Sequence, residues 1–236
     1  MRVRVGARVA STGAEGPGRR YAVWLQGCSI RCPGCCNPHL FGRGGGEPVP
    51  VAALLDEVRG AQADPETAIE GVTLLGGEPF EQAEALAPFA EGVRALGLSV
   101  VAFSGYRLEE LLAPPLAGPA VARLLRAVDV LVDGRYESGQ PDDSRPWVGS
   151  RNQRFHYLTA RYSPAIERTG VEGPVRTVEV RLSPDGRVSV NGWPVGLGMK
   201  AGGRPVRESG RRGDQNEEPS RSRQREERPG RSSGRT

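Results

Sequence analysis

The chain has 236 residues and a formal net charge of +4, and only 37% of its residues are hydrophobic and 6% aromatic. This length is enough for one domain with additions, and the low apolar content indicates that part of the chain does not fold. No apolar run could cross a bilayer and the start does not resemble a signal peptide, so we expect a cytoplasmic protein without a membrane partner. Lys200 is the only lysine among many arginines; this reads as compositional bias and does not favour a nucleic-acid partner.

Alternating strands and helices are predicted along the first part of the chain. Apolar strands are expected at residues 2–9, 21–25, 69–75, 98–103 and 128–132. Helices are expected at 51–62, 81–96 and 121–126, with a break at Pro114-Pro115, and the stretches 11–20 and 42–50 are expected to be loops. Strands joined by helices indicate an α/β fold with a parallel sheet and right-handed crossovers. The strand–helix units are too few for a complete barrel of eight such units, so we predict an open partial (β/α) barrel.

The C-terminal part has a different pattern. Val178, Val180 and Leu182 alternate with charged residues, and the pattern resumes after a turn at residues 184–186, which predicts a β-hairpin over 177–190. Residues 201–236 are rich in Arg, Gly, Ser, Glu and Pro. Such a segment cannot bury enough apolar surface to offset its ordering entropy, so we expect a disordered tail.

The four cysteines lie together between Cys28 and Cys36, which favours a metal site over disulfides in a cytoplasmic chain. Cys28, Cys32 and Cys35 could wrap one face of a 4Fe–4S cluster, leaving one iron open for another ligand. Cys36 adjoins Cys35 and should point away, as a buried small residue or a spare thiol. A second cysteine pair for zinc is missing, but His39 could complete a Cys₃His set, so a zinc module stays open.

Polar or glycine-rich loops follow several predicted strands, at the strand ends where α/β folds place their chemistry. In residues 76–79 the glycines allow close approach and Glu78 could accept hydrogen bonds from an ammonium group. Ser104 could bind a cofactor or cap the next helix. Arg135 could form a surface ion pair with Asp133 at a turn, since a planar guanidinium suits a carboxylate. Asn152 and Gln153 could bind a cofactor or order their loop, or residues 150–152 could simply form a turn.

Three short motifs carry a family resemblance. They are Gly-Pro-Gly-Arg-Arg at 16–20, Gln-Gly-Cys at 26–28, and the run from Cys28 through Cys32 and Cys35 to Asn37-Pro38. Together they resemble the radical S-adenosylmethionine (SAM) superfamily, in particular the activating proteins of anaerobic ribonucleotide reductase and of pyruvate formate-lyase. The resemblance covers residues 1–160, the expected radical SAM core. A C-terminal extension with the hairpin (161–200) and the Arg-rich tail (201–236) follow.

The resemblance implies a 4Fe–4S cluster held by Cys28, Cys32 and Cys35, with no protein catalytic group beyond the cluster and SAM. It implies a set of SAM-binding residues: Gly76, Gly77, Glu78, Pro79, Ser104, Asp133, Arg135 and Asn152. The activity would be reductive cleavage of SAM to a 5′-deoxyadenosyl radical that installs a glycyl radical on a partner enzyme, with flavodoxin or ferredoxin as electron donor. A radical SAM enzyme for another peptide or small molecule, and a non-catalytic iron–sulfur or zinc module, are the alternatives.

Overall fold

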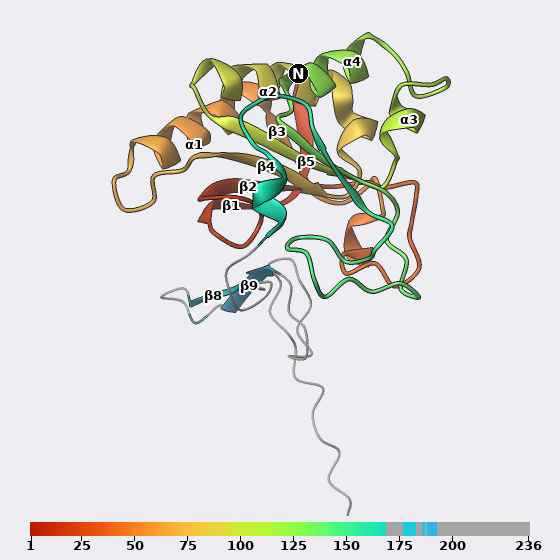
Figure 1. The fold of residues 1–236 in the computed structure, drawn as a ribbon. Coiled ribbons are helices and arrows are strands. Elements are labelled where there is room, and N and C mark those ends of the chain that lie inside the picture. The colour runs from red at the N-terminus through yellow and green to blue at the C-terminus, as the bar shows by residue number, and fades with distance from the viewer. Residues whose placement is uncertain (169–176, 183–185, 187, 193–236) are drawn as a thin grey trace, which may run out of the picture. The chain divides into compact units, whose positions relative to one another are not determined.

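The computed structural model describes residues 1–168, 177–182, 186 and 188–192 (Figure 1). The predicted tail and most of the predicted hairpin turn lie outside these residues. Seven strands form one sheet in the order β3-β1-β2-β4-β5-β6-β7. Their bounds are Arg2–Thr12 (β1), Arg20–Leu25 (β2), Glu47–Pro50 (β3), Gly71–Gly76 (β4), Ser99–Ser104 (β5), Val130–Asp133 (β6) and Arg154–Tyr157 (β7).

The centre of the sheet is parallel. Strands β2, β4, β5 and β6 pair in parallel, with Tyr21 opposite Val72 and Ala102 opposite Leu131. Strands β1, β3 and β7 add antiparallel pairs at the two sides. The α/β fold is therefore confirmed. The described strands form an open order with β3 and β7 at its ends, and the partial barrel stays a prediction.

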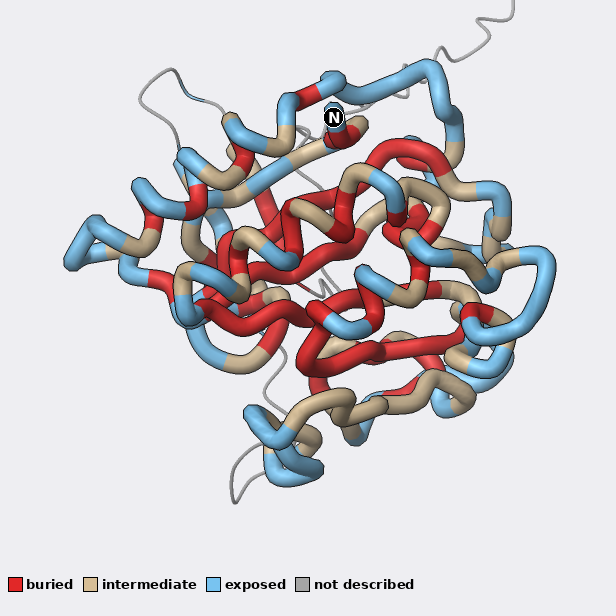
Figure 2. Tube along the Cα trace, turned by 90° about the horizontal axis from the view of Figure 1, so that it is seen from above, coloured by how far each residue is buried: buried red, intermediate tan, exposed pale blue. Residues whose placement is uncertain are grey.

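The helices cover one face of the sheet (Figure 1). They are α1 (Val51–Ala63), α2 (Ala83–Ala95), α3 (Leu108–Leu111) and α4 (Pro119–Ala127), with short 3₁₀ turns η1 (Pro38–Leu40), η2 (Pro79–Gln82) and η3 (Pro164–Glu167). Leu54, Phe89 and Leu124 are fully buried and pack in one core with apolar side chains of the sheet. Figure 2 shows this burial concentrated along the central strands.

Among the described elements no α-helix packs on the opposite face of the sheet, where the short η1 and η3 turns contribute Leu40 and Ile166. Alternation along the strands separates the two faces. On β2, Val23 and Leu25 belong to the helix-covered core, whereas Trp24 packs with Leu40 and Leu75 on the other side. Phe103 also packs on this second face. The second face, together with the carboxyl ends of the parallel strands, is where the site lies.

Two strands were not predicted. The stretch 42–50, expected to be a loop, contains β3, whose Val49 pairs with Val3 of β1. Its prolines lack N–H donors and are tolerated because β3 lies at the sheet edge. Strand β7 pairs with β6, with His156 opposite Leu131. Both strands are short and owe their formation to pairing with distant residues. Among the described residues, no helix is both long and apolar enough to cross a membrane.

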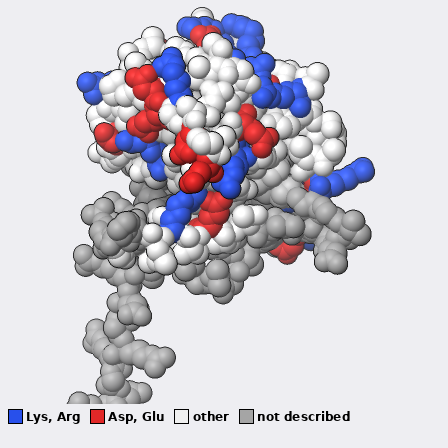
Figure 3. Space-filling model, turned by 90° about the vertical axis from the view of Figure 1, so that its left-hand side faces the viewer, with Lys and Arg blue, Asp and Glu red and all other residues white. Residues whose placement is uncertain are grey.

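The predicted hairpin is confirmed as β8 (Val178–Leu182) paired antiparallel with β9 (Val188–Gly192). Its polar side chains contact the end of β1: Arg181 Nη2 donates to the Ser11 carbonyl at 2.6 Å, and Asn191 Nδ2 to Thr12 Oγ1 at 2.8 Å. On the face drawn in Figure 3, acidic and basic side chains are interspersed. Charges of both signs there neutralise one another locally.

Candidate functional site

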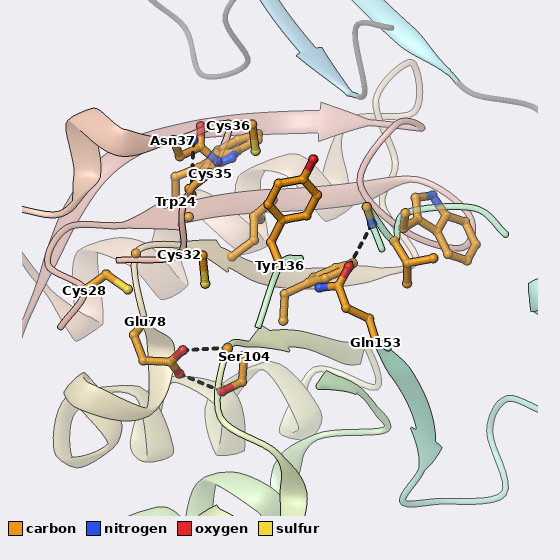
Figure 4. Close-up of a pocket in the computed structure, with 18 of the residues that line it drawn as sticks. Trp24, Cys28, Cys32, Cys35, Cys36, Asn37, Glu78, Ser104, Tyr136 and Gln153 are labelled. Carbon is orange, nitrogen blue, oxygen red and sulfur yellow. Dashed lines mark hydrogen bonds between the residues drawn. The ribbon is translucent and has the colours of Figure 1, made fainter. Parts of the chain in front are cut away.

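A cavity of about 200 Å³ lies at the carboxyl ends of the parallel strands, and all four cysteines line it. The central strands also contribute: Trp24 from β2, Leu75 and Gly76 from β4, and Phe103 and Ser104 from β5. Parallel strands end at the same edge of a sheet, so residues far apart in the sequence meet here. Figure 4 shows Cys28, Cys32 and Cys35 in succession along one side, with Glu78 beside Cys28 and hydrogen-bonded to Ser104.

The cysteine loop is held by its backbone. The Gly27 N–H donates to the Leu40 carbonyl at 2.8 Å, and the Cys28 N–H to that of Phe41 at 3.2 Å. The Cys35 N–H donates to the Cys32 carbonyl at 3.2 Å, which closes a turn. These bonds leave the three predicted ligand thiols half-buried on the cavity wall.

The thiols differ in acidity. Burial raises the pKa of Cys28 and of Cys32. A hydrogen bond from the Cys36 thiol lowers the pKa of Cys35 to about 6, and the same bond raises that of Cys36. The prediction that Cys36 points away from Cys35 was wrong, because Cys36 lines the cavity and its thiol bonds to that of its neighbour. Cys36 is exposed, so it is not the buried small residue that was considered, and its role as a spare thiol stays a prediction. Adjacent residues in an irregular loop need not alternate as they do in a strand.

A single metal ion has no ready-made site in the described residues. They hold no group of three or more His, Cys, Asp or Glu side chains spaced to share one ion. His39, the candidate fourth zinc ligand, lies exposed on η1. The three thiols along a wide cavity instead suit a larger group that bridges them.

The glycine loop after β4 lies against the cysteine loop. The Gly77 N–H donates to the Leu25 carbonyl and the Glu78 N–H to the Gly27 carbonyl, each at 2.8 Å. A Cβ added to Gly77 would lie 2.3 Å from the Gly27 oxygen, so only glycine permits this approach. The loop therefore brings Glu78 to the cavity beside Cys28 (Figure 4).

The Glu78 carboxylate is buried and fully engaged. It accepts hydrogen bonds from Ser104 Oγ at 2.9 Å, the Gly105 N–H at 2.9 Å and the Phe80 N–H at 3.0 Å. Burial nonetheless raises the pKa of Glu78 to about 7. Ser104 and Glu78 thus form one unit, and Pro79 begins the η2 turn directly after them.

Two residues of η2 that sequence reasoning missed bind neighbouring loops. Glu81 accepts bonds from the Ser29 N–H and hydroxyl and from Arg43. Burial alone would raise the pKa of Glu81, but these hydrogen bonds together lower it. Gln82 Nε2 donates to the Gln26 carbonyl at 3.0 Å. The only sequence signal was the presence of two polar side chains just after the Gly-Gly-Glu-Pro segment.

Asp133, Arg135 and Asn152 are engaged with protein groups beside the cavity. Asp133 is fully buried and accepts bonds from the Leu108 N–H at 2.6 Å and from Arg154 Nη2 at 2.7 Å. Arg135 pairs with Glu110 at 3.1 Å, so the considered Asp133–Arg135 ion pair was wrong. Asn152 Nδ2 donates to the Arg135 carbonyl at 2.7 Å. Their contacts with SAM stay predictions.

The segment 134–153 forms the other side of the cavity and is held by its own side chains. Gln153 Oε1 accepts from the Gly149 N–H at 2.8 Å and the Ser150 N–H at 3.2 Å, which is an ordering role. Asp142 accepts from Arg145 Nε at 2.7 Å. Trp147 lines the cavity with a positive φ of 62°, a strained value for a non-glycine residue.

The fold and the cysteine-lined cavity define an α/β iron–sulfur type of domain, and comparison with known proteins agrees. The model of the 4Fe-4S single cluster domain family matches residues 14–156. The anaerobic ribonucleoside-triphosphate reductase-activating protein of Escherichia coli K12 is 31% identical over 148 residues, 61% of this chain and 92% of that protein. The proteins of the same name from Haemophilus influenzae (31% over 151 residues, 60% and 90%) and Enterobacteria phage T4 (28% over 145 residues, 60% and 85%) also match.

The chain therefore belongs to the 4Fe-4S single cluster domain family, in the group that contains these reductase-activating proteins. This confirms the family that the three cysteine-region motifs indicated. The hairpin β8–β9 lies outside the matched residues 14–156.

Proposed function

We propose that this chain is a radical SAM enzyme of the open partial-barrel type that works in the cytoplasm and installs a glycyl radical on a partner enzyme. One observation carries the proposal. The thiols of Cys28, Cys32 and Cys35 line the same cavity as the Glu78 loop, so a cluster and its cofactor could be held side by side.

The chemistry of the donor set fits a 4Fe–4S cluster. Three cysteine ligands leave one iron free for a non-protein ligand, as cluster-bound SAM requires. The absence of a single-ion set among the described residues favours such a cluster over zinc. Cys28, Cys32 and Cys35 would be the ligands. When bound, the cluster and SAM would supply a one-electron reductive cleavage that yields a 5′-deoxyadenosyl radical able to remove a hydrogen atom from the substrate.

The chain's own residues would bind and orient SAM and exclude water. Gly76, Gly77 and Pro79 shape a loop that brings the Glu78 carboxylate to the cavity, where it would accept hydrogen bonds from the SAM ammonium group. Ser104 holds that carboxylate in place at 2.9 Å. Asp133, Arg135 and Asn152 would complete the site, and Arg135 would have to leave Glu110 to reach the SAM carboxylate.

The relatives' name supports the choice of partner, since they are called activating proteins of anaerobic ribonucleoside-triphosphate reductase. We therefore propose a glycyl radical enzyme as the substrate and a flavodoxin or ferredoxin as the electron donor. One observation favours the alternative of another peptide or small-molecule substrate. Thr177 and Gly192, at the base of the hairpin, line the cavity but lie outside the region shared with the family.

The test is anaerobic reconstitution with iron and sulfide, followed by dithionite and SAM, with iron per chain and 5′-deoxyadenosine as readouts. Wild type should form both the cluster and 5′-deoxyadenosine, and Cys32→Ala should lose both. Cys36→Ala is the matched control and should keep both. A wild-type protein that binds only zinc, or a Cys32→Ala variant that still cleaves SAM, would overturn the proposal.

A further inference from the structure

The residue that follows Cys28 is held by one carboxylate. Glu81 Oε1 accepts from the Ser29 N–H at 2.8 Å and from the Ser29 hydroxyl at 2.5 Å. Ser29 itself is an exposed residue in an irregular loop. Hydrogen bonds to a charged acceptor are stronger than those between neutral groups. Glu81 therefore fixes a position that has little packing of its own.

Glu81 is in turn held from several sides. Its side chain is only 10% exposed, and Arg43 Nη2 donates to its Oε2 at 2.9 Å. The Tyr106 hydroxyl donates to its Oε1 at 3.4 Å, and the Glu81 N–H donates to the Glu78 carbonyl at 3.2 Å. The carboxylate thus joins the cysteine loop to residues from two other loops, and its geometry does not depend on a single contact.

The residue before Cys28 is held by the same turn. The Glu78 N–H donates to the Gly27 carbonyl at 2.8 Å, so residues 78 and 81 hold the cysteine on both sides. Figure 4 shows Cys28 and Glu78 on the same side of the cavity. Cys35 is held by other bonds, because the Asn37 N–H donates to its Sγ at 3.4 Å.

We propose that Glu81 is a positioning residue for Cys28: through Ser29 it keeps this thiol on the cavity wall beside Glu78, in place to ligate the cluster. The inference deepens the proposed function and rests on it for the identity of the bound group. The placement of the thiol can be measured in the protein without a cluster.

The experiment compares wild type with Glu81→Ala, Glu81→Gln and Ser29→Ala, and uses Glu84→Ala, a change of an exposed glutamate on α2, as the matched control. The cluster-free proteins are alkylated with iodoacetamide under reducing, anaerobic conditions, and mass spectrometry gives the rate at each cysteine. Glu81→Ala should speed alkylation of Cys28 by about threefold to tenfold, because two hydrogen bonds that hold the loop are lost. Cys35 and the Glu84→Ala protein should keep the wild-type rates.

The Glu81→Gln variant distinguishes the loss of the hydrogen bonds to Ser29 from the loss of the negative charge. An amide oxygen can still accept from Ser29, so this variant should stay near the wild-type Cys28 rate although it has lost the negative charge. Equal acceleration in Glu81→Gln and Glu81→Ala would show a charge effect and overturn the proposal. Equal acceleration at Cys28 and Cys35 would show general loosening and would also overturn it. Ser29→Ala, which removes only the hydroxyl bond, should give a smaller increase confined to Cys28.

Reconstitution gives the second readout. Glu81→Ala should take up cluster iron several-fold more slowly than wild type, with Glu81→Gln restoring most of the rate. Wild-type reconstitution without SAM cleavage would refute the proposed function but leave the Cys28 result standing. If Glu81→Ala left the alkylation rate of Cys28 unchanged while wild type cleaved SAM normally, only the positioning role would be refuted.

Discussion

The two sides of the cavity are built differently. On one side the thiols of Cys28, Cys32 and Cys35 are half-buried and the loop that carries them is held by its backbone and by Glu81. On the other side, in residues 134–153, the side chains of Asp142 and Gln153 bind other parts of the same loop. The first side presents side chains to a ligand, whereas the second uses its polar side chains to maintain its own shape.

The difference follows from hydrogen-bond satisfaction. An irregular loop must find partners for its backbone N–H groups, because an unpaired buried group is costly. In residues 134–153 these partners are carbonyls and side chains of the same segment, so the polar atoms of Asp142 and Gln153 are already engaged. The cysteine loop takes its acceptors from η1 and the residue after it, from its own Cys32 carbonyl and from Glu81 of η2, and its three predicted ligand thiols line the cavity. Polar residues near a cavity are therefore not all ligand-binding residues.

The largest effect on stability is expected for Asp133, which anchors the start of the second side. Asp133→Ala would leave the Leu108 N–H without its acceptor and remove one partner of Arg154. The Arg154 side chain is 43% exposed and keeps Glu109, so the loss comes mainly from the hydrogen bonds to the buried carboxylate, which contribute about 1.5–3 kcal/mol each. Urea unfolding of the cluster-free protein should show a loss of this size.

The control for this change is Asp56→Ala, which removes an exposed carboxylate paired with Arg59. Surface pairs of this kind contribute roughly 0.2–1 kcal/mol. Cys32→Ala in the same assay should also stay close to wild type. If Cys32→Ala were as unstable as Asp133→Ala, the contrast between the two sides of the cavity would be lost.

A smaller effect on stability, which depends on pH, is expected for Glu78. This residue lies beside the thiols, but its carboxylate is bonded to protein groups, as are the polar side chains of residues 134–153. Its pKa is about 7 in the folded protein against 4.5 for an unperturbed glutamate. Between these values the folded state holds a proton that the unfolded state has lost, so stability falls as the pH rises from about 4.5 to 7 and is then constant. The full difference is up to about 3 kcal/mol.

Glu78→Gln removes this titration. The stability of the variant relative to wild type should therefore improve between pH 5 and pH 8, as measured by urea unfolding at several pH values. Glu84→Gln, at an exposed position on α2, should show no such trend. A pH-independent difference between Glu78→Gln and wild type would mean that Glu78 is ionised throughout and is held as an anion by its three donors.

The smallest effect is expected for Gln153. Gln153→Ala would remove the acceptor of the Gly149 and Ser150 N–H groups and should cost about 1–2 kcal/mol. Gln140→Ala is the control in the same loop. Gln140 is exposed, and its side chain donates to the exposed Glu137 carboxylate. A wild-type stability for Gln153→Ala would place this residue with the ligand-binding groups instead.

Much of the fold could be predicted because its signals are local. The apolar runs that became β2, β4, β5 and β6 are buried on both faces, so each forms a continuous hydrophobic segment. Strands β3 and β7 lack this signal, because they are edge strands that form by pairing with β1 and β6. Of the site, the cysteine spacing and the Gly-Gly-Glu-Pro segment were visible, whereas Glu81 was not, since its partner Ser29 lies far away in the sequence.

By itself the sequence determined the alternation of strands and helices, the clustering of the cysteines in one loop and the family. These properties depend on residue types and on separations of a few positions, and both can be read directly from the sequence. Only the tertiary structure decided which protein groups each polar side chain near the cavity is bonded to. Asp133 ends β6, Arg135 follows it and Gln153 precedes β7, and their hydrogen bonds go to Arg154, Glu110 and the Gly149 N–H. The Glu78 carboxylate likewise accepts from protein groups. An unpaired buried polar group is costly, so the fold pairs each one with a nearby group, and that group often comes from a distant part of the sequence.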